Sequence, residues 1–332
     1  MHSCSGALSR VLNVPAWWTE EGKRMQRTYG AIRAEHVSQM KRFWRRNKTG
    51  WLFVAPFLIL FVVFNLLPVL SAARMSLYHD NMIQAPVKVG MENYARLLLD
   101  DDVFLLALRN TFIFALFIGP LGYLLSFFMA WCLNGLKFRN FFALIFYAPS
   151  ITSGVAMTQV WLYILSNDSY GLVNYFLLRN GLINTPILWN QSATYIFPAV
   201  ILISVWMSMG TGFLVFMAGL QNLPGEVLEQ GRIDGIKNRF TELIYLIFPM
   251  MKPQLLFGAI NAIVGSFTVF DVVVQFAGMP SPNYAAHTIV AHLYDHAFLR
   301  FEMGYASAVA VVLFLITFIL GQVCMKVFRS DE

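Results

Sequence analysis

Three histidines and one aspartate within ten residues are the first candidates for ligand chemistry: His287, His292, Asp295 and His296. His292 and His296 lie four residues apart, so on a helix they would share one face, a spacing that suits zinc. Imidazole is also the side chain whose charge changes nearest to neutral pH, so a pH sensor is a second alternative. A third is a structural contact of these side chains with their own surroundings.

Small polar side chains inside otherwise apolar stretches form a second group. In lipid such side chains cost free energy, and they therefore face a cavity or a neighbouring helix. Two sets recur at helical spacing: Ser204, Ser208 and Thr211 beside Trp206, and Asn261, Thr268 and Asp271 with Ser266 nearby. Hydrogen bonding between helices is the alternative for the hydroxyls. For Asp271 the alternative is a structural ion pair or an interfacial cap.

The motifs of common catalytic sites are absent from the sequence. It contains no Gly-x4-Gly-Lys-Ser/Thr phosphate loop, no Gly-x-Ser-x-Gly turn and no His-Glu-x-x-His helix. Cys4, Cys132 and Cys324 are too far apart to form a metal or redox motif. We therefore expect no catalytic residue, no metal and no cofactor bound by this chain, which is neither an ATPase nor a membrane-embedded hydrolase.

Composition indicates which elements position these residues. Of 332 residues, 58% are hydrophobic and 13% are charged, whereas a soluble domain carries about 25% charged residues. A helix crosses a bilayer with about 20 mostly apolar residues. Six stretches reach that length, which predicts an all-α polytopic membrane protein with six transmembrane helices at 51–73, 110–133, 141–165, 195–220, 253–277 and 304–327.

The basic residues indicate how these spans are oriented. With six spans both termini lie on one side, and 18 of the 24 Lys and Arg residues fall on that side. The positive-inside rule identifies it as the cytoplasm. The net charge of +6 thus reflects orientation and not nucleic-acid binding. We expect a basic cytoplasmic tail at 1–50, a membrane domain at 51–328 and a cytoplasmic tail at 329–332.

The cytoplasmic loop at 221–252 has the pattern of a short helix followed by a turn. Pro224-Gly225 begins the helix, and Asp234-Gly235 ends it through a left-handed residue. Its apolar side would consist of Val227, Leu228 and Ile233. A second helix would lead into the fifth span. The spacing fits a solvated hairpin and equally a helix that docks in a groove of a cytosolic partner.

This loop resembles the signature of the permease subunits of ABC importers, in the branch for maltose-type carbohydrates and glycerol phosphate. The family's Glu-Ala-Ala…Asp-Gly signature is matched by Glu229 and Asp234-Gly235, while Gln230-Gly231 replaces the alanines. The resemblance extends from Arg45 to the C-terminus and includes Trp51-Leu-Phe-Val-Ala-Pro56, Tyr170-Gly171-Leu-Val-Asn174 and Phe301-Glu-Met-Gly-Tyr-Ala-Ser307. The chain is identified as a member of this family, and the expected fold is the type I ABC importer permease.

The resemblance implies a transport subunit of the bacterial inner membrane that carries a sugar or sugar derivative. It would pair with a second permease and with two cytosolic ATPase subunits that bind ATP and Mg²⁺, and an extracytoplasmic solute-binding protein would deliver the substrate. Residues 225–236 would be the coupling helix, in which Glu229 and Asp234 bear on the ATPase while Gly231 and Gly235 permit close approach. The alternatives are a permease for peptides, amino acids or phosphate, and a secondary transporter, against which the few charges in the spans argue.

Two candidate sites are interpreted through this resemblance. A sugar offers hydroxyls and a flat apolar face, so its site needs small polar groups and aromatics. The candidate substrate path consists of Ser204, Trp206, Ser208, Thr211, Ser266 and Asp271, with Tyr163 as a further aromatic. The histidine segment corresponds to a family region that packs outside between the last two spans and lacks histidine ligands. We therefore expect a structural or binding-protein contact there.

Overall fold

The computed structural model describes residues 48–329. The tails predicted at 1–50 and 329–332 lie almost wholly outside the described residues. The chain divides into two parts, Met1–Leu70 and Ser71–Glu332.

The described residues of the first part belong to one apolar helix that ends at Met75. α3 (Lys48–Phe61) continues through a π-helical turn, η1 (Val62–Leu66), into α4 (Leu67–Met75). The stretch Thr49–Met75 has a mean hydropathy of 2.6 and is long enough to cross a membrane. The first predicted span is confirmed.

Short elements follow this helix: β1 (Tyr78–His79), β2 (Val87–Lys88), α5 (Glu92–Ala95) and the π turn η2 (Arg96–Asp100). The two strands pair antiparallel. Asn93 is buried and donates to the carbonyl oxygens of Ser76 and Tyr78, at 2.8 and 3.0 Å. These bonds satisfy backbone acceptors that the short hairpin leaves free, and they hold α5 against β1.

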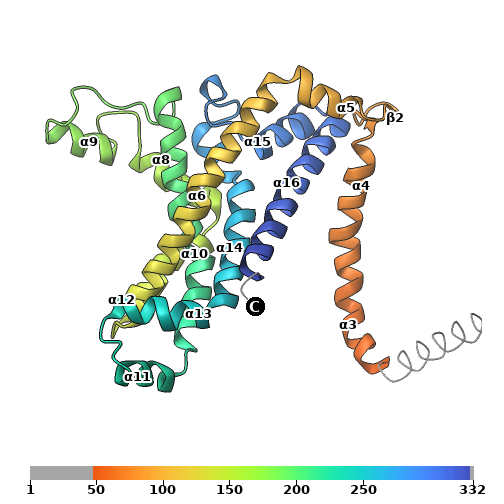
Figure 1. The fold of residues 1–332 in the computed structure, drawn as a ribbon. Helices are drawn as coiled ribbons and strands as arrows, with labels where there is room; N and C mark the ends of the chain where they lie inside the picture. Colours follow the sequence, from red (N-terminus) through yellow and green to blue (C-terminus); the bar gives the residue numbers. More distant parts are fainter. Residues whose placement is uncertain (1–47, 330–332) are drawn as a thin grey trace, which may run out of the picture. The chain divides into compact units, whose positions relative to one another are not determined.

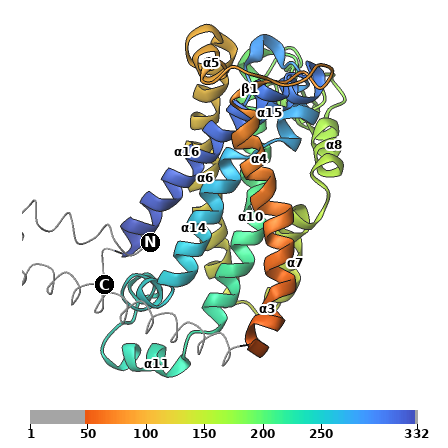
Figure 2. The ribbon, with the colours of Figure 1, turned by 90° about the vertical axis from the view of Figure 1, so that its right-hand side faces the viewer.

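Four helices form the framework of the second part: α6 (Asp102–Asn134), α10 (Ala193–Gln221), α14 (Lys252–Phe267) and α16 (Met303–Arg329). α6 packs against α10 and α14, and α14 also contacts α16 (Figures 1 and 2). Asp101 caps α6 by accepting a hydrogen bond from the Phe104 amide at 2.8 Å. α6, α10 and α16 are each long and apolar enough to cross a membrane, which confirms the second, fourth and sixth predicted spans.

The third predicted span is not a single helix. α7 (Arg139–Ile151) and α8 (Gly154–Ile164) meet at 102°, so the prediction of one continuous helix over 141–165 is wrong. The backbone is extended at Thr152 and Ser153. Pro149 removes a backbone donor from the last turn of α7 and so weakens that helix just before the break.

The prediction of one continuous helix for the fifth span, 253–277, is also wrong. A helical stretch formed by α12 (Arg239–Glu242), η3 (Leu243–Ile247) and α13 (Phe248–Met250) meets α14 at 82°. Pro253 lies in the first turn of α14, where no backbone donor is needed, and so favours a helix start at this bend. α14 ends at Phe267, and residues Val273–Ala277 form a separate π turn, η4. Among the described residues, four helices and two bent pairs give up to six spans.

Further short segments lie at the end of the framework away from α11 (Gly225–Ile233) (Figure 1). They are α9 (Leu172–Arg179), η5 (Pro282–Tyr284), α15 (Ile289–Tyr294) and η6 (Asp295–Leu299). Asn174 of α9 organises its loop: its amide donates to three backbone carbonyls, and its oxygen accepts from the Ile187 amide and from Trp189 Nε1. Because Asn174 is fully buried, these bonds are shielded from water.

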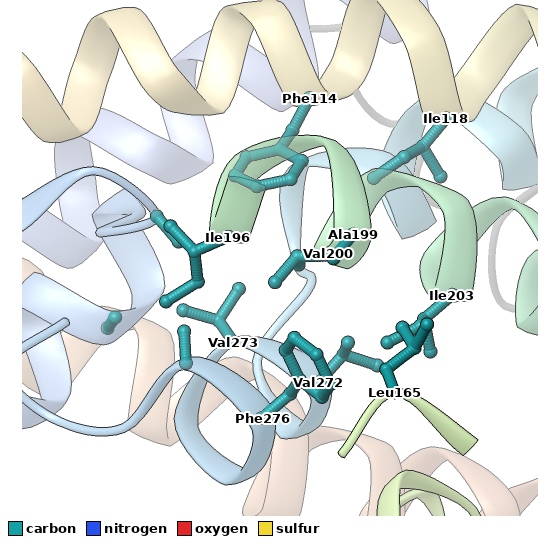
Figure 3. Close-up of a cluster of buried hydrophobic side chains, with 13 residues drawn as sticks. Phe114, Ile118, Leu165, Ile196, Ala199, Val200, Ile203, Val272, Val273 and Phe276 are labelled. Carbon is teal, nitrogen blue, oxygen red and sulfur yellow. The ribbon is translucent and has the colours of Figure 1, made fainter. Parts of the chain in front are cut away.

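An apolar cluster fixes the chain segment that follows α14. Val272, Val273 and Phe276 pack against Ile196 and Val200 of α10, and Phe114 of α6 closes the cluster (Figure 3). Val273 and Phe276 are at most 2% exposed. The neighbouring Asp271 is thereby held at a defined position beside α10.

Candidate functional site

A cavity of about 480 Å³ lies between α6, α7, α8, α10 and α14. Small-molecule sites typically measure about 300–1,000 Å³. Polar side chains on its wall include Ser126, Ser150, Thr152, Ser204, Ser208, Thr211, Asn261, Ser266, Thr268 and Asp271. Three aromatic side chains, Tyr123, Phe216 and Phe270, complete the wall. The cavity thus combines hydroxyls with apolar ring surfaces.

Five of the six residues predicted for a substrate path line this cavity: Ser204, Ser208, Thr211, Ser266 and Asp271. Trp206 does not, because it lies about 200° around α10 from Ser204. Its indole packs edge-on against Trp161, with ring centroids 5.5 Å apart. Tyr163 also lies outside the wall and is 69% exposed. Trp206 and Tyr163 therefore do not supply the aromatic surface of this cavity.

Several hydroxyls on the cavity wall donate their hydrogen bonds to backbone carbonyls of the protein. Ser208 Oγ donates to the Val205 carbonyl and Ser266 Oγ to the Ile263 carbonyl, both at 2.8 Å. Their oxygen lone pairs are then acceptors for a ligand that brings hydroxyl donors. Ser204 Oγ is buried and has no hydrogen-bond partner among the described residues. These alcohols suit a polyhydroxylated ligand.

Asp271 is the only charged residue on the described wall of the cavity. Its carboxylate lies directly against the Cα of Gly154, the first residue of α8. A side chain at position 154 would take its place, and the positive end of the α8 dipole favours a negative charge there. The cavity therefore carries one localised negative charge, which accepts hydrogen bonds from hydroxyls and repels acidic ligands.

At the other end of the framework, α11 (Gly225–Ile233) has the predicted length and the predicted end. Gly235 has a φ of +100°, in the region that favours glycine. The chain reverses there, and the Ile236 amide donates back to the Gly231 carbonyl at 2.9 Å. The short helix and its left-handed end are confirmed.

The predicted apolar side of α11 is divided between two faces of the helix. Leu228 packs against an apolar cluster with members from α6, α10, η3 and α14, and Gly231 is buried with Leu246 of η3 directly against its Cα. Ile233 lies two positions past Gly231, about 200° around the helix, and is 84% exposed. Ile233 is therefore not on the inner side, and Gly231 permits close approach of this chain's own Leu246 and not of a partner.

The outer face of α11 carries mixed charge around one apolar side chain. Glu229 and Asp234 are exposed on either side of Ile233. Arg232 pairs with Glu242 of α12, with 3.6 Å between Nη2 and Oε1. Because the Arg232 side chain is 64% exposed, this pair contributes only about 0–1 kcal/mol. Its effect is to connect α11 with α12 and leave Glu229, Ile233 and Asp234 directed outward.

The three histidines lie at the end opposite α11, and all are buried, with at most 2% exposure. The carboxylate that meets them is not that of Asp295 but that of Asp101, at the start of α6. Asp101 Oδ2 lies 3.3 Å from His292 Nε2 and 3.9 Å from His296 Nε2. His287 packs edge-on against His292, with ring centroids 5.6 Å apart. The histidines thus form a contact between α15, η6 and the start of α6.

Further polar groups surround this cluster. Tyr305 Oη donates to Asp101 Oδ2 at 2.7 Å. His296 Nδ1 lies 2.7 Å from Glu302 Oε2, and Glu302 also pairs with both terminal nitrogens of Arg96 at 3.1 and 3.2 Å. Asp295 stands apart from the histidines because it pairs with Arg300 at 2.8 Å.

The protonation states in this cluster follow from burial and from these bonds. Burial lowers the pKa of His292 and His296, and it lowers the pKa of His287 to about 4, so the imidazoles are neutral at neutral pH. Partial burial would raise the pKa of Glu302, but the bonds with Arg96 and His296 outweigh it and hold that pKa below its usual range. An ionised Glu302 only accepts, so the His296 proton lies on Nδ1 and Nε2 carries a lone pair.

Comparison with known proteins decides the family. The profile described as "Binding-protein-dependent transport system inner membrane component" matches residues 122–328. The chain belongs to this family. The matched region of the permease includes most of the cavity wall, α11 and the histidine segment.

Individual relatives agree with this assignment. The permease is 31% identical to the "Arabinooligosaccharides transport system permease protein AraP" of Bacillus subtilis (strain 168), over 87% of this chain and 91% of that protein. It is 32% identical to the "Lactose transport system permease protein LacF" of Rhizobium radiobacter, over 86% and 94%. A crystal structure of a bacterial alginate ABC transporter, in complex with its alginate-bound periplasmic protein, has a chain with the same fold (TM-score 0.74, 19% identity, 87% and 98% covered).

Proposed function

We propose that this permease forms, together with a second permease subunit, the path by which a neutral sugar or oligosaccharide crosses the inner membrane. The observation that carries the proposal is the cavity, whose wall combines serine and threonine hydroxyls with aromatic rings and one carboxylate. A carboxylate binds sugar hydroxyls through charge-assisted hydrogen bonds, while the rings cover the apolar face of the sugar. AraP and LacF, named for arabinooligosaccharides and lactose, support the same class of substrate.

In this proposal α11 transmits the motion that moves the substrate. Two cytosolic ATPase subunits bind ATP and Mg²⁺, and one of them receives the outer face of α11 with Glu229, Ile233 and Asp234. Ile233 supplies the apolar contact, since it is 84% exposed, and the two carboxylates set its register. Closure of the ATPase dimer then shifts α11, and because Leu228 and Gly231 pack inward the shift reaches η3 and the apolar cluster that η3 shares with α10.

The remaining partners and the orientation follow from the same proposal. A solute-binding protein delivers the sugar to the end that carries α9 and α15, as suggested by the alginate complex that includes its periplasmic protein. Both termini and α11 then lie in the cytoplasm, in agreement with the basic residues on that side. ATP hydrolysis belongs to the ATPase subunits, and this chain contributes the path and the coupling.

Uptake of labelled solutes by cells that express the complete importer tests the proposed substrate class. We expect uptake of at least one neutral mono- or oligosaccharide, and loss of that uptake when this permease is deleted. Unlabelled acidic sugars should compete weakly because Asp271 repels them. Uptake of a peptide, an amino acid or phosphate in place of every sugar tested would contradict the proposal.

A further inference from the structure

The buried cluster around Asp101 has the spacing of a metal site. One carboxylate oxygen of Asp101 and one ring nitrogen each of His292 and His296 lie within 4.8 Å of one another. Zinc bound at about 2.0–2.1 Å in tetrahedral geometry places its ligand atoms roughly 3.3 Å apart. Asp101 Oδ2 and His292 Nε2 are 3.3 Å apart, and the distance from Asp101 Oδ2 to His296 Nε2 is 3.9 Å.

The two imidazoles bring unused nitrogens to this point. Neither ring nitrogen of His292 has a hydrogen-bond partner, although the residue is only 1% exposed. Its Nε2 lies 3.3 Å from Asp101 Oδ2 but forms no hydrogen bond with it. His296 Nε2 carries a lone pair because the proton lies on Nδ1, facing Glu302. Two ring nitrogens and a carboxylate oxygen therefore converge on one buried point.

We propose that Asp101, His292 and His296 bind one divalent transition-metal ion, for which Zn²⁺ is the best match. Two neutral imidazole nitrogens and one carboxylate oxygen are a donor set that zinc accepts. The surrounding bonds support such a site: Glu302 orients His296 through its other nitrogen, as outer-shell carboxylates do for metal-bound histidines, and Arg96 holds Glu302 in turn. Tyr305 donates to Asp101 and orients that ligand as well.

An ion at this site would connect two parts of the chain that are distant in sequence. Asp101 caps α6, His292 lies on α15, and His296 lies on η6 just before α16. The ion would fix the segment between α14 and α16 to the start of α6, where buried polar groups otherwise remain unsatisfied. This role is structural and does not depend on the substrate that the permease carries.

The test is a measurement of bound metal on the full-length chain, purified in detergent through a tag that contains no histidine. After chelation and re-addition of Zn²⁺, we expect about one tightly held zinc per chain by elemental analysis. Zinc at about 100 times its Kd should raise the melting temperature by about 5 °C. Co²⁺ in place of zinc should give visible absorption bands that His292→Ala lacks.

Matched variants locate the ligands. His292→Ala, His296→Ala and Asp101→Asn should each lose the bound ion, and Asn at 101 can still accept from the Phe104 amide and cap α6. His79→Ala removes an exposed histidine, and Asp295→Asn removes the carboxylate that pairs with Arg300, so both should keep the zinc.

The proposal is overturned if the wild type takes up no more zinc than His292→Ala and shows no shift in melting temperature. Retention of zinc by Asp101→Asn would show that the Asp101 carboxylate is not a zinc ligand. Because the zinc titration of the wild type needs no variant, it decides the matter even where a variant fails to fold.

Discussion

Replacement of Gly235 by alanine probes the turn that ends α11. Gly235 has a φ of +100°, and a Cβ added there meets nothing within 4 Å. The cost of alanine is therefore confined to the backbone and amounts to about 1–3 kcal/mol. If α11 must keep this turn in order to dock on an ATPase subunit, docking weakens by about 5- to 140-fold.

The assay compares ATP-driven sugar uptake and retention of the ATPase subunits on the purified permease, at equal amounts of protein in the membrane. We expect Gly235→Ala to insert normally, to lose most of its ATPase and to transport slowly. Gly235→Asn should be intermediate, because asparagine tolerates positive φ better than alanine does.

Gly225→Ala is the matched control. Gly225 is the first residue of α11, also has open space around a Cβ, and has no positive φ. It should behave as the wild type. Wild-type docking and uptake in Gly235→Ala, or equal damage in Gly225→Ala, would refute the reasoning about this turn.

Three other variants test the cavity and the loop of α9. Gly122→Val would drive a side chain into Ser208 across the interface of α6 and α10. Uptake should fall more than about tenfold, and the free energy of unfolding should fall by about 1–3 kcal/mol. The control Gly321→Val, whose side chain meets open space, should transport normally. Asp271→Asn should raise the KM for sugar uptake about 10- to 100-fold through loss of a charge-assisted hydrogen bond, and an unchanged KM would remove Asp271 from the substrate path. Asn174→Ala leaves the Ile187 amide and Trp189 Nε1 without their acceptor, so hydrogen exchange of the Ile187 amide should become about 5- to 150-fold faster. The control Asn180→Ala loses one exposed bond to the Phe176 carbonyl and should leave that exchange rate unchanged.

Features that depend on neighbouring residues could be predicted from the sequence. The end of α11 follows from a glycine after an aspartate, since only the local backbone decides it. The long apolar helices follow from hydropathy, because lipid demands an unbroken hydrogen-bonded backbone. The placement of Ser204, Ser208 and Thr211 on one wall follows from helical periodicity.

Features that depend on packing between distant segments could not be predicted from the sequence. Hydropathy does not register the 102° break between α7 and α8, since residues on both sides of Thr152 are equally apolar. The helical spacing that places Ser204, Ser208 and Thr211 on one wall also places Trp206 on the opposite side of α10, where it packs against Trp161. A search of the sequence for nearby aromatic residues does not reveal this. Nothing in the sequence around Asp101 points to His292, and only the fold brings the two side chains together.

The most direct test of the central claim is sugar uptake by the purified importer in proteoliposomes, with this permease, its partner permease, the ATPase subunits and the solute-binding protein. Labelled sugar should accumulate only when ATP is supplied on the side of α11 and the loaded binding protein is present on the opposite side. Accumulation by this chain alone, driven by an ion gradient without any ATPase, would contradict it.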